Sequence, residues 1–166
     1  EQRYNWDLVY CELYAGGKYN TNMGANYEYS IGLNGLGLCA TQFASEYMDV
    51  EIKRDGYKYN LHFEKGFNIG GLSKEEYAGR DTGTKIKWKP DIKVFTEVDI
   101  PSADLMDTMR RQAIVNKGLL FVFRDQKGAR FETSEFIYKD GITEYLSETV
   151  GDTNLTSIQT WAGDRK

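Results

Sequence analysis

The chain has 166 residues, of which 40% are hydrophobic and 28% charged, and these fractions are ordinary for one globular domain with its own core. Its formal net charge of −4 gives no basic excess of the kind that indicates nucleic-acid binding. The apolar runs are too short to span a bilayer and no signal peptide opens the sequence, so we expect a cytoplasmic protein without membrane contact.

The first third of the chain predicts two helices separated by a polar segment. An apolar pattern at helical spacing begins at Trp6, with Asn5 as the N-cap and the glycine pair 16–17 as the stop. Residues 18–30 are polar and show no period, so we expect a long loop, and such loops are usually functional or mobile. A second apolar helical run covers residues 36–48.

The middle of the chain predicts strands. Three runs alternate apolar and polar residues and are therefore assigned as strands: 49–54, 57–64 and 84–89. The dipeptide Asp55-Gly56 between the first two runs is a strong hairpin signal. Residues 65–82 contain several glycines and are predicted to form a loop, and Pro90 ends the third strand.

The remainder predicts a helix, a hairpin and a short helix. Pro101 or Ser102 is expected to begin a helix that Gly118 ends. Its apolar stripe consists of Leu105, Met106, Met109 and Ala113. Two further strands are predicted over 119–124 and 130–138, and a helix over 142–150. Because hairpins join most strands and each helix offers one apolar stripe, we expect an α/β (α+β) two-layer sandwich, with a mostly antiparallel mixed sheet and helices on one face.

Cysteine and histidine usage gives no sign of metal chemistry. Cys11 and Cys39 lie in apolar helical patterns and are predicted to be reduced core thiols. The one histidine, His62, stands between Leu61 and Phe63 in an alternating run, which favours a strand residue over a ligand or catalytic base. With one histidine and no cysteine cluster, no zinc site is predicted.

The stretch Gly32-Leu33-Asn34-Gly35-Leu36-Gly37 places three glycines at the start of the second predicted helix. Glycine lets a ligand approach the backbone closely, and the first turn of a helix has free N–H groups at the positive end of its dipole. The stretch therefore favours a phosphate cradle, although glycines that only permit tight packing explain the same spacing. It is neither a dinucleotide fingerprint nor a Walker loop, since no strand directly precedes it and no Gly-Lys-Ser/Thr ends it.

Three strings in a fixed order make this interpretation more specific: YAGGKY at 14–19, YEYSIGLNGLG at 27–37 and TGTKIKW at 82–88. With KRDGYKYNLHFEKG and FIYKDGITEYL, they make nearly the whole chain resemble the ATPase region of bacterial type IIA topoisomerase B subunits, the gyrase B and topoisomerase IV B proteins. These are GHKL ATPases. The resemblance implies the GHKL (Bergerat) fold, with 1–150 as the C-terminal portion of that domain and 151–166 as a tail or the start of a linker to a transducer domain.

The resemblance also implies a nucleotide site. Lys18 would face phosphate oxygens, Tyr27 would lie near the nucleotide, and Thr84 would help to hold the adenine amino group, partly through water. Arg54 matches an arginine at the pocket mouth, where inhibitors bind. Asn34 replaces the more familiar histidine, and its amide can donate to a phosphate but has no positive charge. Each assignment has a plain alternative without a ligand. Lys18 would be a solvated lysine and Tyr27 a loop tyrosine, while Thr84 would be a good β-former and Arg54 a surface charge. The expected ATP-binding residues are Gly16, Gly17, Lys18, Tyr27, Gly32, Leu33, Asn34, Gly35, Leu36, Gly37 and Thr84.

Two elements that the GHKL family needs are not found in the sequence. One is a helix with Glu-x-x-x-Asn, whose glutamate is the general base and whose asparagine holds magnesium; the other is Asp-x-Gly-x-Gly, which reads adenine. Glu64 and Asn68 have the first spacing, but the predicted strand ends there and Gly66 interrupts the run. In the family both elements precede the position of Tyr14, and the transducer lysine follows that of Lys166. We therefore expect a fragment without its N-terminal part, with no catalytic or metal-binding residues, no meaningful ATPase activity alone, and an exposed edge that favours self-association.

In the intact enzyme the resemblance implies that ATP and magnesium drive homodimerisation of two ATPase domains. This dimer would capture DNA and couple hydrolysis to strand passage, together with the remainder of the B subunit and an A subunit. The expected parent is the B subunit of DNA gyrase, which serves supercoiling, and the alternative is the corresponding subunit of topoisomerase IV. A non-catalytic interaction module on the same scaffold explains the same residues. A chaperone or histidine kinase relative is disfavoured by the pairing of YAGGKY with the KRDG hairpin.

Overall fold

The computed structural model describes residues 4–15, 35–153 and 155–161. The chain divides into two compact units, Glu1–Val98 (unit 1) and Asp99–Lys166 (unit 2). Both units combine helices with antiparallel strands, as the predicted α+β class requires. A domain boundary at residue 150, expected from the sequence, stays a prediction.

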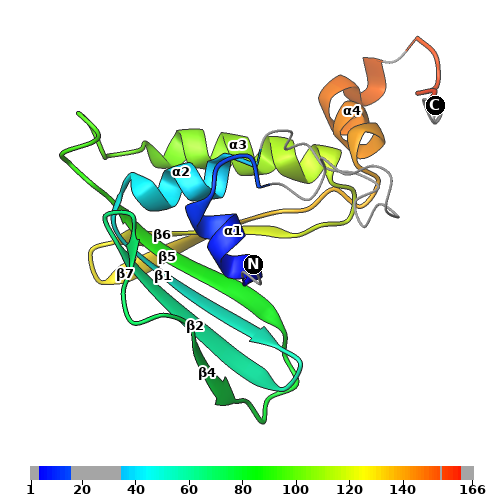
Figure 1. Ribbon diagram of the computed structural model, residues 1–166. Coiled ribbons are helices and arrows are strands. Elements are labelled where there is room, and N and C mark those ends of the chain that lie inside the picture. Colours follow the sequence, from blue (N-terminus) through cyan, green and yellow to red (C-terminus); the bar gives the residue numbers. More distant parts are fainter. Residues whose placement is uncertain (1–3, 16–34, 154, 162–166) are drawn as a thin grey trace. The chain divides into compact units, whose positions relative to one another are not determined.

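Unit 1 contains two short helices and one antiparallel sheet (Figure 1). Its helices are α1 (Asn5–Cys11) and α2 (Gly37–Phe43). Its strands are β1 (Ser45–Arg54), β2 (Tyr57–Glu64), β3 (Phe67–Asn68), β4 (Ser73–Glu76) and β5 (Gly83–Pro90). The strand order is β3-β2-β1-β5, and β4 also pairs with β2. β5 is therefore an edge strand of this sheet, with β1 as its neighbour.

The β1–β2 hairpin confirms the turn that was predicted at Asp55-Gly56. Both turn residues have positive φ, +55° and +77°, the backbone that a two-residue hairpin turn requires. The resulting register places Met48 between Phe63 of β2 and Trp88 of β5. All apolar residues of the alternating runs consequently point to one face of the sheet.

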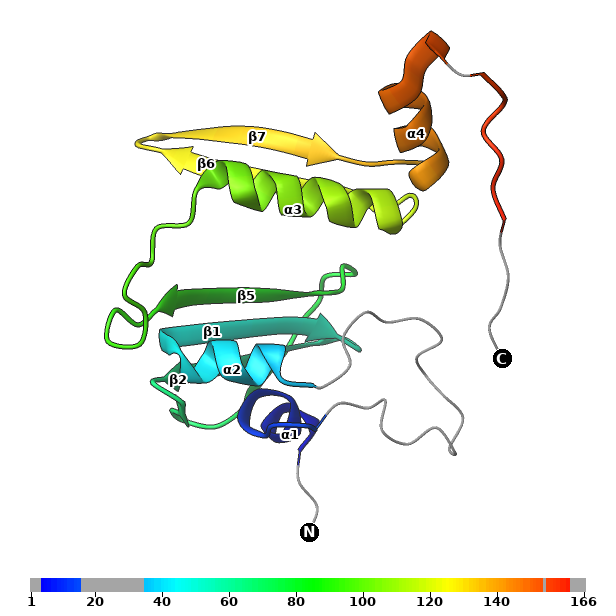
Figure 2. The same cartoon turned by 90° about the horizontal axis from the view of Figure 1, so that it is seen from above.

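The core of unit 1 lies between that face and the two helices (Figure 2). The Tyr10 ring of α1 stacks on the Phe63 ring at 5.5 Å, and Trp6 meets the same ring edge-on at 6.3 Å. The buried cluster consists of Tyr10, Met48, Val50, Leu61 and Phe63. The prediction of helices on one face of a sheet is thus confirmed within unit 1. Cys11 and Cys39 are not joined in a disulfide, and Cys39 of α2 is fully buried.

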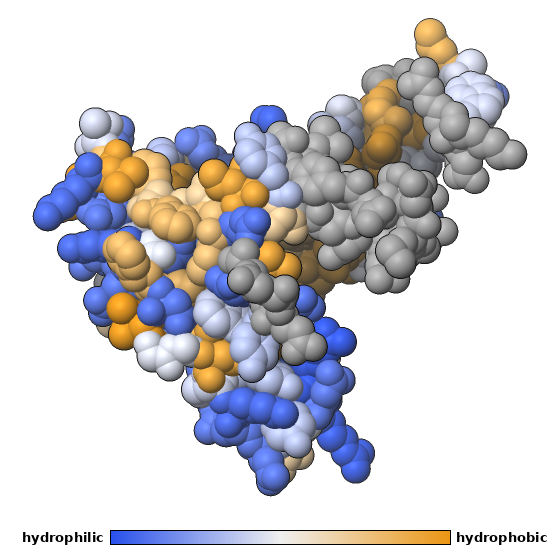
Figure 3. Space-filling model, in the orientation of Figure 1, coloured by the Kyte–Doolittle hydropathy of each residue, from blue (hydrophilic) through white to orange (hydrophobic). Residues whose placement is uncertain are grey.

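Two predictions in unit 1 are wrong. The helix predicted over 36–48 ends at Phe43, because Met48 enters the core as a strand residue and the β1 pairings begin at Ser45. Ser45 donates from its Oγ to the carbonyl of Thr41 at 2.5 Å, which closes the helix. The predicted loop at 65–82 contains β3 and β4. β4 is exposed throughout and gives a hydrophilic surface in Figure 3, so no apolar alternation marks it in the sequence.

Unit 2 packs one helix against a hairpin and adds a second helix. Its elements are α3 (Ser102–Val115), β6 (Phe121–Lys127), β7 (Arg130–Phe136), α4 (Ile142–Val150) and the 3₁₀ turn η1 (Gly151–Thr153). Ala113 of α3 is fully buried, which agrees with its place in the predicted stripe. Tyr138 is buried too, and its ring meets Tyr145 of α4 edge-on at 6.1 Å. The helix predicted over 142–150 is confirmed. β6 begins two residues later and ends three residues later than predicted, and β7 ends two residues earlier.

Helix ends differ slightly from the prediction. Tyr4, not Asn5, occupies the N-cap position of α1, and no side chain caps that end. None of the helices within the described ranges is both long and apolar enough for a bilayer crossing.

Candidate functional site

The N-terminal end of α2 presents backbone rather than side chains. Gly35 has a φ of +61°, and Leu36 is the N-cap residue. The first helical hydrogen bond runs from the N–H of Ala40 to the carbonyl of Leu36 at 2.8 Å, so the preceding amides have no acceptor in the helix. Among the described residues, nothing lies within 4 Å of the position that a Cβ of Gly37 would take. An anion can therefore approach these amides closely.

Two further sequence-predicted residues lie at one end of the β1–β5 pair. Thr84 is the second residue of β5, and its Cα partner is Ile52 of β1. Arg54 ends β1, two residues after Ile52. Since side chains alternate along a strand, Thr84 and Arg54 share the sheet face that the helices cover. Arg54 is well exposed, and its Nε donates to Asp55 Oδ2 at 2.9 Å.

α2 is directed toward the same end of the sheet. The chain reverses at Ala44 between α2 and β1, so α2 runs back along the beginning of β1 (Figure 2). Because α2 has seven residues and β1 has ten, α2 spans only part of the strand, and residues 35–37 point toward the end at which Arg54 and Thr84 lie without reaching it. The other predicted residues lie outside the described ranges: Gly16, Gly17, Lys18, Tyr27, Gly32, Leu33 and Asn34.

Sequence reasoning missed a side-chain cluster at the beginning of β5, on the sheet face opposite to Thr84. Lys53 of β1 places its Nζ 2.9 Å from Asp81 Oδ2, and the Tyr77 hydroxyl donates to the other oxygen of the same carboxylate. The Lys53 ammonium also lies 4.9 Å from the centre of the Tyr77 ring. Hydrogen bonding to Asp81 raises the pKa of Lys53, and the Tyr77 hydroxyl, followed by Lys53, lowers the pKa of Asp81. No local pattern links residues 28 positions apart, so only the register of β5 on β1 reveals this cluster.

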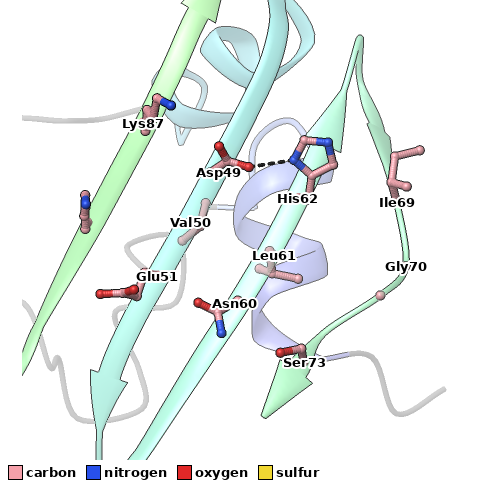
Figure 4. A pocket seen from close by; sticks show the side chains of 12 residues that line it. Asp49, Val50, Glu51, Asn60, Leu61, His62, Ile69, Gly70, Ser73 and Lys87 are labelled. Carbon is pink, nitrogen blue, oxygen red and sulfur yellow. Dashed lines mark hydrogen bonds and ion pairs between the residues drawn. The ribbon is translucent and has the colours of Figure 1, made fainter. Parts of the chain in front are cut away.

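The opposite, polar face of the sheet holds a cavity of about 540 Å³ (Figure 4). Its charged lining includes Asp49, Glu51, His62, Lys85 and Lys87. His62 Nδ1 lies 2.6 Å from Asp49 Oδ1 and Nε2 lies 3.2 Å from Glu64 Oε1, and these hydrogen bonds, first with Asp49, raise the pKa of His62. The prediction of His62 as a strand residue is confirmed. In the described part of the chain, no three His, Cys, Asp or Glu side chains gather as a metal site.

Comparison with known proteins identifies the relatives of this chain. It is 32% identical to the DNA topoisomerase 4 B subunit of Salmonella typhimurium over 145 residues, which is 87% of this chain and 22% of that protein. It is 30% identical to the DNA gyrase B subunit of Synechocystis sp. over 147 residues, 88% of this chain and 13% of that protein. The solved 43K ATPase domain of Thermus thermophilus gyrase B, in complex with an aminocoumarin, matches with a TM-score of 0.64 and 25% identity, over 71% of this chain and 32% of that chain. The chain is homologous to the ATPase domain of type IIA topoisomerase B subunits.

The resemblance predicted from the three strings is therefore confirmed, together with the fold class, because the structural neighbours are GHKL ATPase domains of topoisomerase B subunits. No protein-family model matches the chain. This homologue of topoisomerase B subunits spans 22% of the Salmonella protein and 13% of the Synechocystis one. The comparison therefore concerns one part of those longer proteins.

Proposed function

We propose that this chain is part of the ATP-binding domain of a type IIA topoisomerase B subunit, and that the α2 end of unit 1 holds the nucleotide. The observation on which the proposal depends is the similarity to such subunits over 87% of the chain. The open amides at Gly37 and the position of Thr84 are compatible with it, because the N-terminal end of α2 points toward the end of the sheet at which Thr84 lies. Topoisomerase IV B subunits and gyrase B subunits both match this chain. The proposal therefore concerns the nucleotide binding that is common to gyrase and topoisomerase IV.

The parts of the site have distinct roles in this proposal. The amides of residues 35–37 receive phosphate oxygens at the positive end of the α2 dipole. The Thr84 hydroxyl, on an exposed edge strand, faces the adenine. Arg54 lies at the mouth of the nucleotide pocket, and its guanidinium has further N–H donors besides the one bonded to Asp55. Gly16, Gly17, Lys18, Tyr27, Gly32, Leu33 and Asn34 complete the expected set.

The hydrolytic machinery is proposed to come from polypeptide outside this sequence. Mg²⁺ would supply neutralisation of the phosphate charge, and a positioned base would orient the attacking water. Glu64 and Asn68 do not form the required helical pair, because Glu64 ends β2 and Asn68 lies in β3. Glu1 and Asn5 share the spacing as well, but Glu1 lies outside the described residues and no role is proposed for the pair. The chain alone is therefore expected to show no meaningful ATP hydrolysis.

In the parent protein, ATP binding would order the site and bring two such domains together. The dimer would then capture DNA and couple hydrolysis to strand passage, together with the rest of the B subunit and the A subunit. We lean toward gyrase as the parent enzyme.

Calorimetry with a non-hydrolysable ATP analogue and magnesium tests the half-site proposal. The titration is run on this chain and on the same chain extended upstream along its natural reading frame. Weak or absent binding by this chain and tight binding by the extended chain are expected, because the extension supplies the magnesium ligand. Equally tight, magnesium-dependent binding by both chains would contradict the proposal. A natural start codon just before Glu1 would instead favour a non-catalytic module.

A further inference from the structure

We propose that Lys53, Tyr77 and Asp81 form a positioning cluster that fixes the beginning of β5, and with it Thr84, beside the nucleotide site. This inference rests on the proposed function, because it assigns a role to residues that support Thr84. The three side chains do not contact nucleotide in this proposal. They act by holding the segment that leads into Thr84.

The beginning of β5 needs such support. Within the described residues β5 pairs with β1 and with no other strand, so it forms an edge. The ladder begins at Gly83, opposite Lys53, and Thr84 is the next residue. The ends of edge strands open most readily, because few contacts have to break. Without a further anchor, the Thr84 hydroxyl would lie on a fraying end.

Asp81 supplies that anchor two residues before the ladder begins. One carboxylate oxygen lies 2.9 Å from Lys53 Nζ, and the other accepts a hydrogen bond from the Tyr77 hydroxyl. Lys53 is the Cα partner of Gly83, the first residue of the β1–β5 ladder. The ion pair therefore adds one more contact between β1 and the segment just before β5. The lowered pKa of Asp81 agrees with a carboxylate that is held charged by both partners.

Tyr77 makes the contacts that hold the segment between β4 and β5. The Tyr77 N–H donates to the carbonyl of Gly56 at 2.8 Å, in the turn that follows Arg54. The chain then passes so closely over the Tyr77 ring that a Cβ on Gly79 would lie 2.3 Å from Tyr77 Cζ. Tyr77 therefore connects the turn beside Arg54 to the carboxylate of Asp81. The cluster links the two residues that the proposed site places at its mouth and at the adenine.

The same pair of strands offers a matched control at its other end. There Lys89 of β5 places its Nζ 2.7 Å from Glu46 Oε2 of β1. Both ion pairs are partly exposed and join the same two strands. Glu46 lies at the beginning of β1 and Arg54 at its end, so the control pair is remote from Thr84. Glu46→Gln and Asp81→Asn remove equivalent charges from the two ends.

The experiment measures amide hydrogen exchange at residues 83–85 and the affinity for a magnesium–ATP analogue by NMR titration. Asp81→Asn and Tyr77→Phe are expected to speed exchange at residues 83–85 about two- to fivefold and to weaken binding by a similar factor. Glu46→Gln is expected to change neither quantity. Circular dichroism verifies that each variant is folded, and Tyr77→Phe provides a second test should Asp81→Asn unfold.

A charge exchange separates positioning from general stability. The double variant Lys53→Asp with Asp81→Lys is expected to recover most of the lost affinity, because it restores the ion pair in reverse. If the unmodified chain binds the analogue and Asp81→Asn binds it equally well, the positioning role is wrong. Where the unmodified chain binds too weakly to measure, the same variants are compared in the chain extended upstream; if that chain also shows no binding at any concentration, the proposed function fails and the positioning role fails with it. The two failures are therefore distinguishable.

Discussion

At the scale of single residues, the candidate site depends on the absence of a side chain at Gly37. No atom of the described residues lies within 4 Å of the position of a Cβ there. A methyl group at this position would therefore clash with none of the described residues. It would, however, occupy the space through which an anion reaches the amides of the first turn.

Gly37→Ala is therefore expected to stabilise the chain and weaken its nucleotide binding. Alanine favours a helix over glycine by about 0.5–1 kcal/mol, which should raise the free energy of unfolding measured in urea. Loss of a phosphate contact should weaken affinity for an ATP analogue about tenfold or more, measured by NMR titration. Because the variant is expected to be more stable, misfolding cannot explain lost binding. Unchanged affinity would place the phosphates elsewhere.

His62 gives a separate prediction on the polar face. Its pKa is raised above the usual 6.5 by Asp49 and then Glu64, so the folded state binds the proton more tightly than the unfolded state. The resulting stability is fully present below about pH 6.5 and is lost as pH rises through the folded pKa. Urea unfolding of the wild type should thus lose stability above that pH relative to Asp49→Asn. Parallel pH profiles for the two proteins would show that the His62–Asp49 interaction does not contribute to stability.

At the scale of elements, unit 1 is organised by the alternation of β1. Met48 and Val50 meet Phe63 and Leu61 on one side and Trp88 and Ile86 on the other. Met48, Val50, Phe63 and Leu61 are buried, while Ile86 and Trp88 on the edge strand stay partly exposed. The helices therefore stabilise the β1–β2 hairpin more than they stabilise β5.

Two phenylalanines of the same sheet test this distribution. Phe63 is fully buried against Tyr10 and Trp6, whereas Phe67 of β3 is 73% exposed. Phe63→Ala should lower the free energy of unfolding by about 3–5 kcal/mol, and Phe67→Ala by less than about 0.5 kcal/mol. Chemical denaturation measures both. Similar losses for the two variants would show that the core lies elsewhere.

Elements with a strong local signal could be predicted from the sequence. Asp55-Gly56 fixed the β1–β2 hairpin, and the alternation around Ile86 located β5. The boundary at Ser45 could not be predicted. The apolar residues after Ser45 are compatible with either a helix or a buried strand, and only the strand pairing distinguishes the two. β4 was missed because its charged side chains pair with β2 without burial.

The string from Gly32 to Gly37 and the TGT string predicted a nucleotide site, and this assignment stays a prediction. The fold places Thr84 and Arg54 on one face at the same end of the β1–β5 pair. The Lys53–Asp81 pair was not predictable. It joins residues 28 positions apart through a register that only the folded sheet sets.

At the scale of the whole molecule, the chain is a pair of compact units that corresponds to about a fifth of a longer relative. β5 is an edge strand in unit 1 and displays Ile86 and Trp88 at 39% and 42% exposure. Unpaired edges with apolar side chains favour association with another strand.

Self-association of the isolated chain is the corresponding prediction. Light scattering should show a mass that rises with concentration, and Ile86→Lys should reduce the rise because a charge opposes strand pairing. Phe67→Lys, on an exposed residue of β3, serves as the control. A strictly monomeric mass at high concentration would contradict the proposed open edge.

The most direct test of the nucleotide site is a map of where an ATP analogue perturbs the chain. Amide chemical shifts of the ¹⁵N-labelled protein are followed as the analogue and magnesium are added. We predict that the described residues that shift most are residues 35–38, Arg54 and Thr84, with saturation at high ligand concentration. Shifts confined to Asp49, His62 and Lys87 on the polar face, or no shifts even in the chain extended upstream, would contradict the proposed nucleotide site.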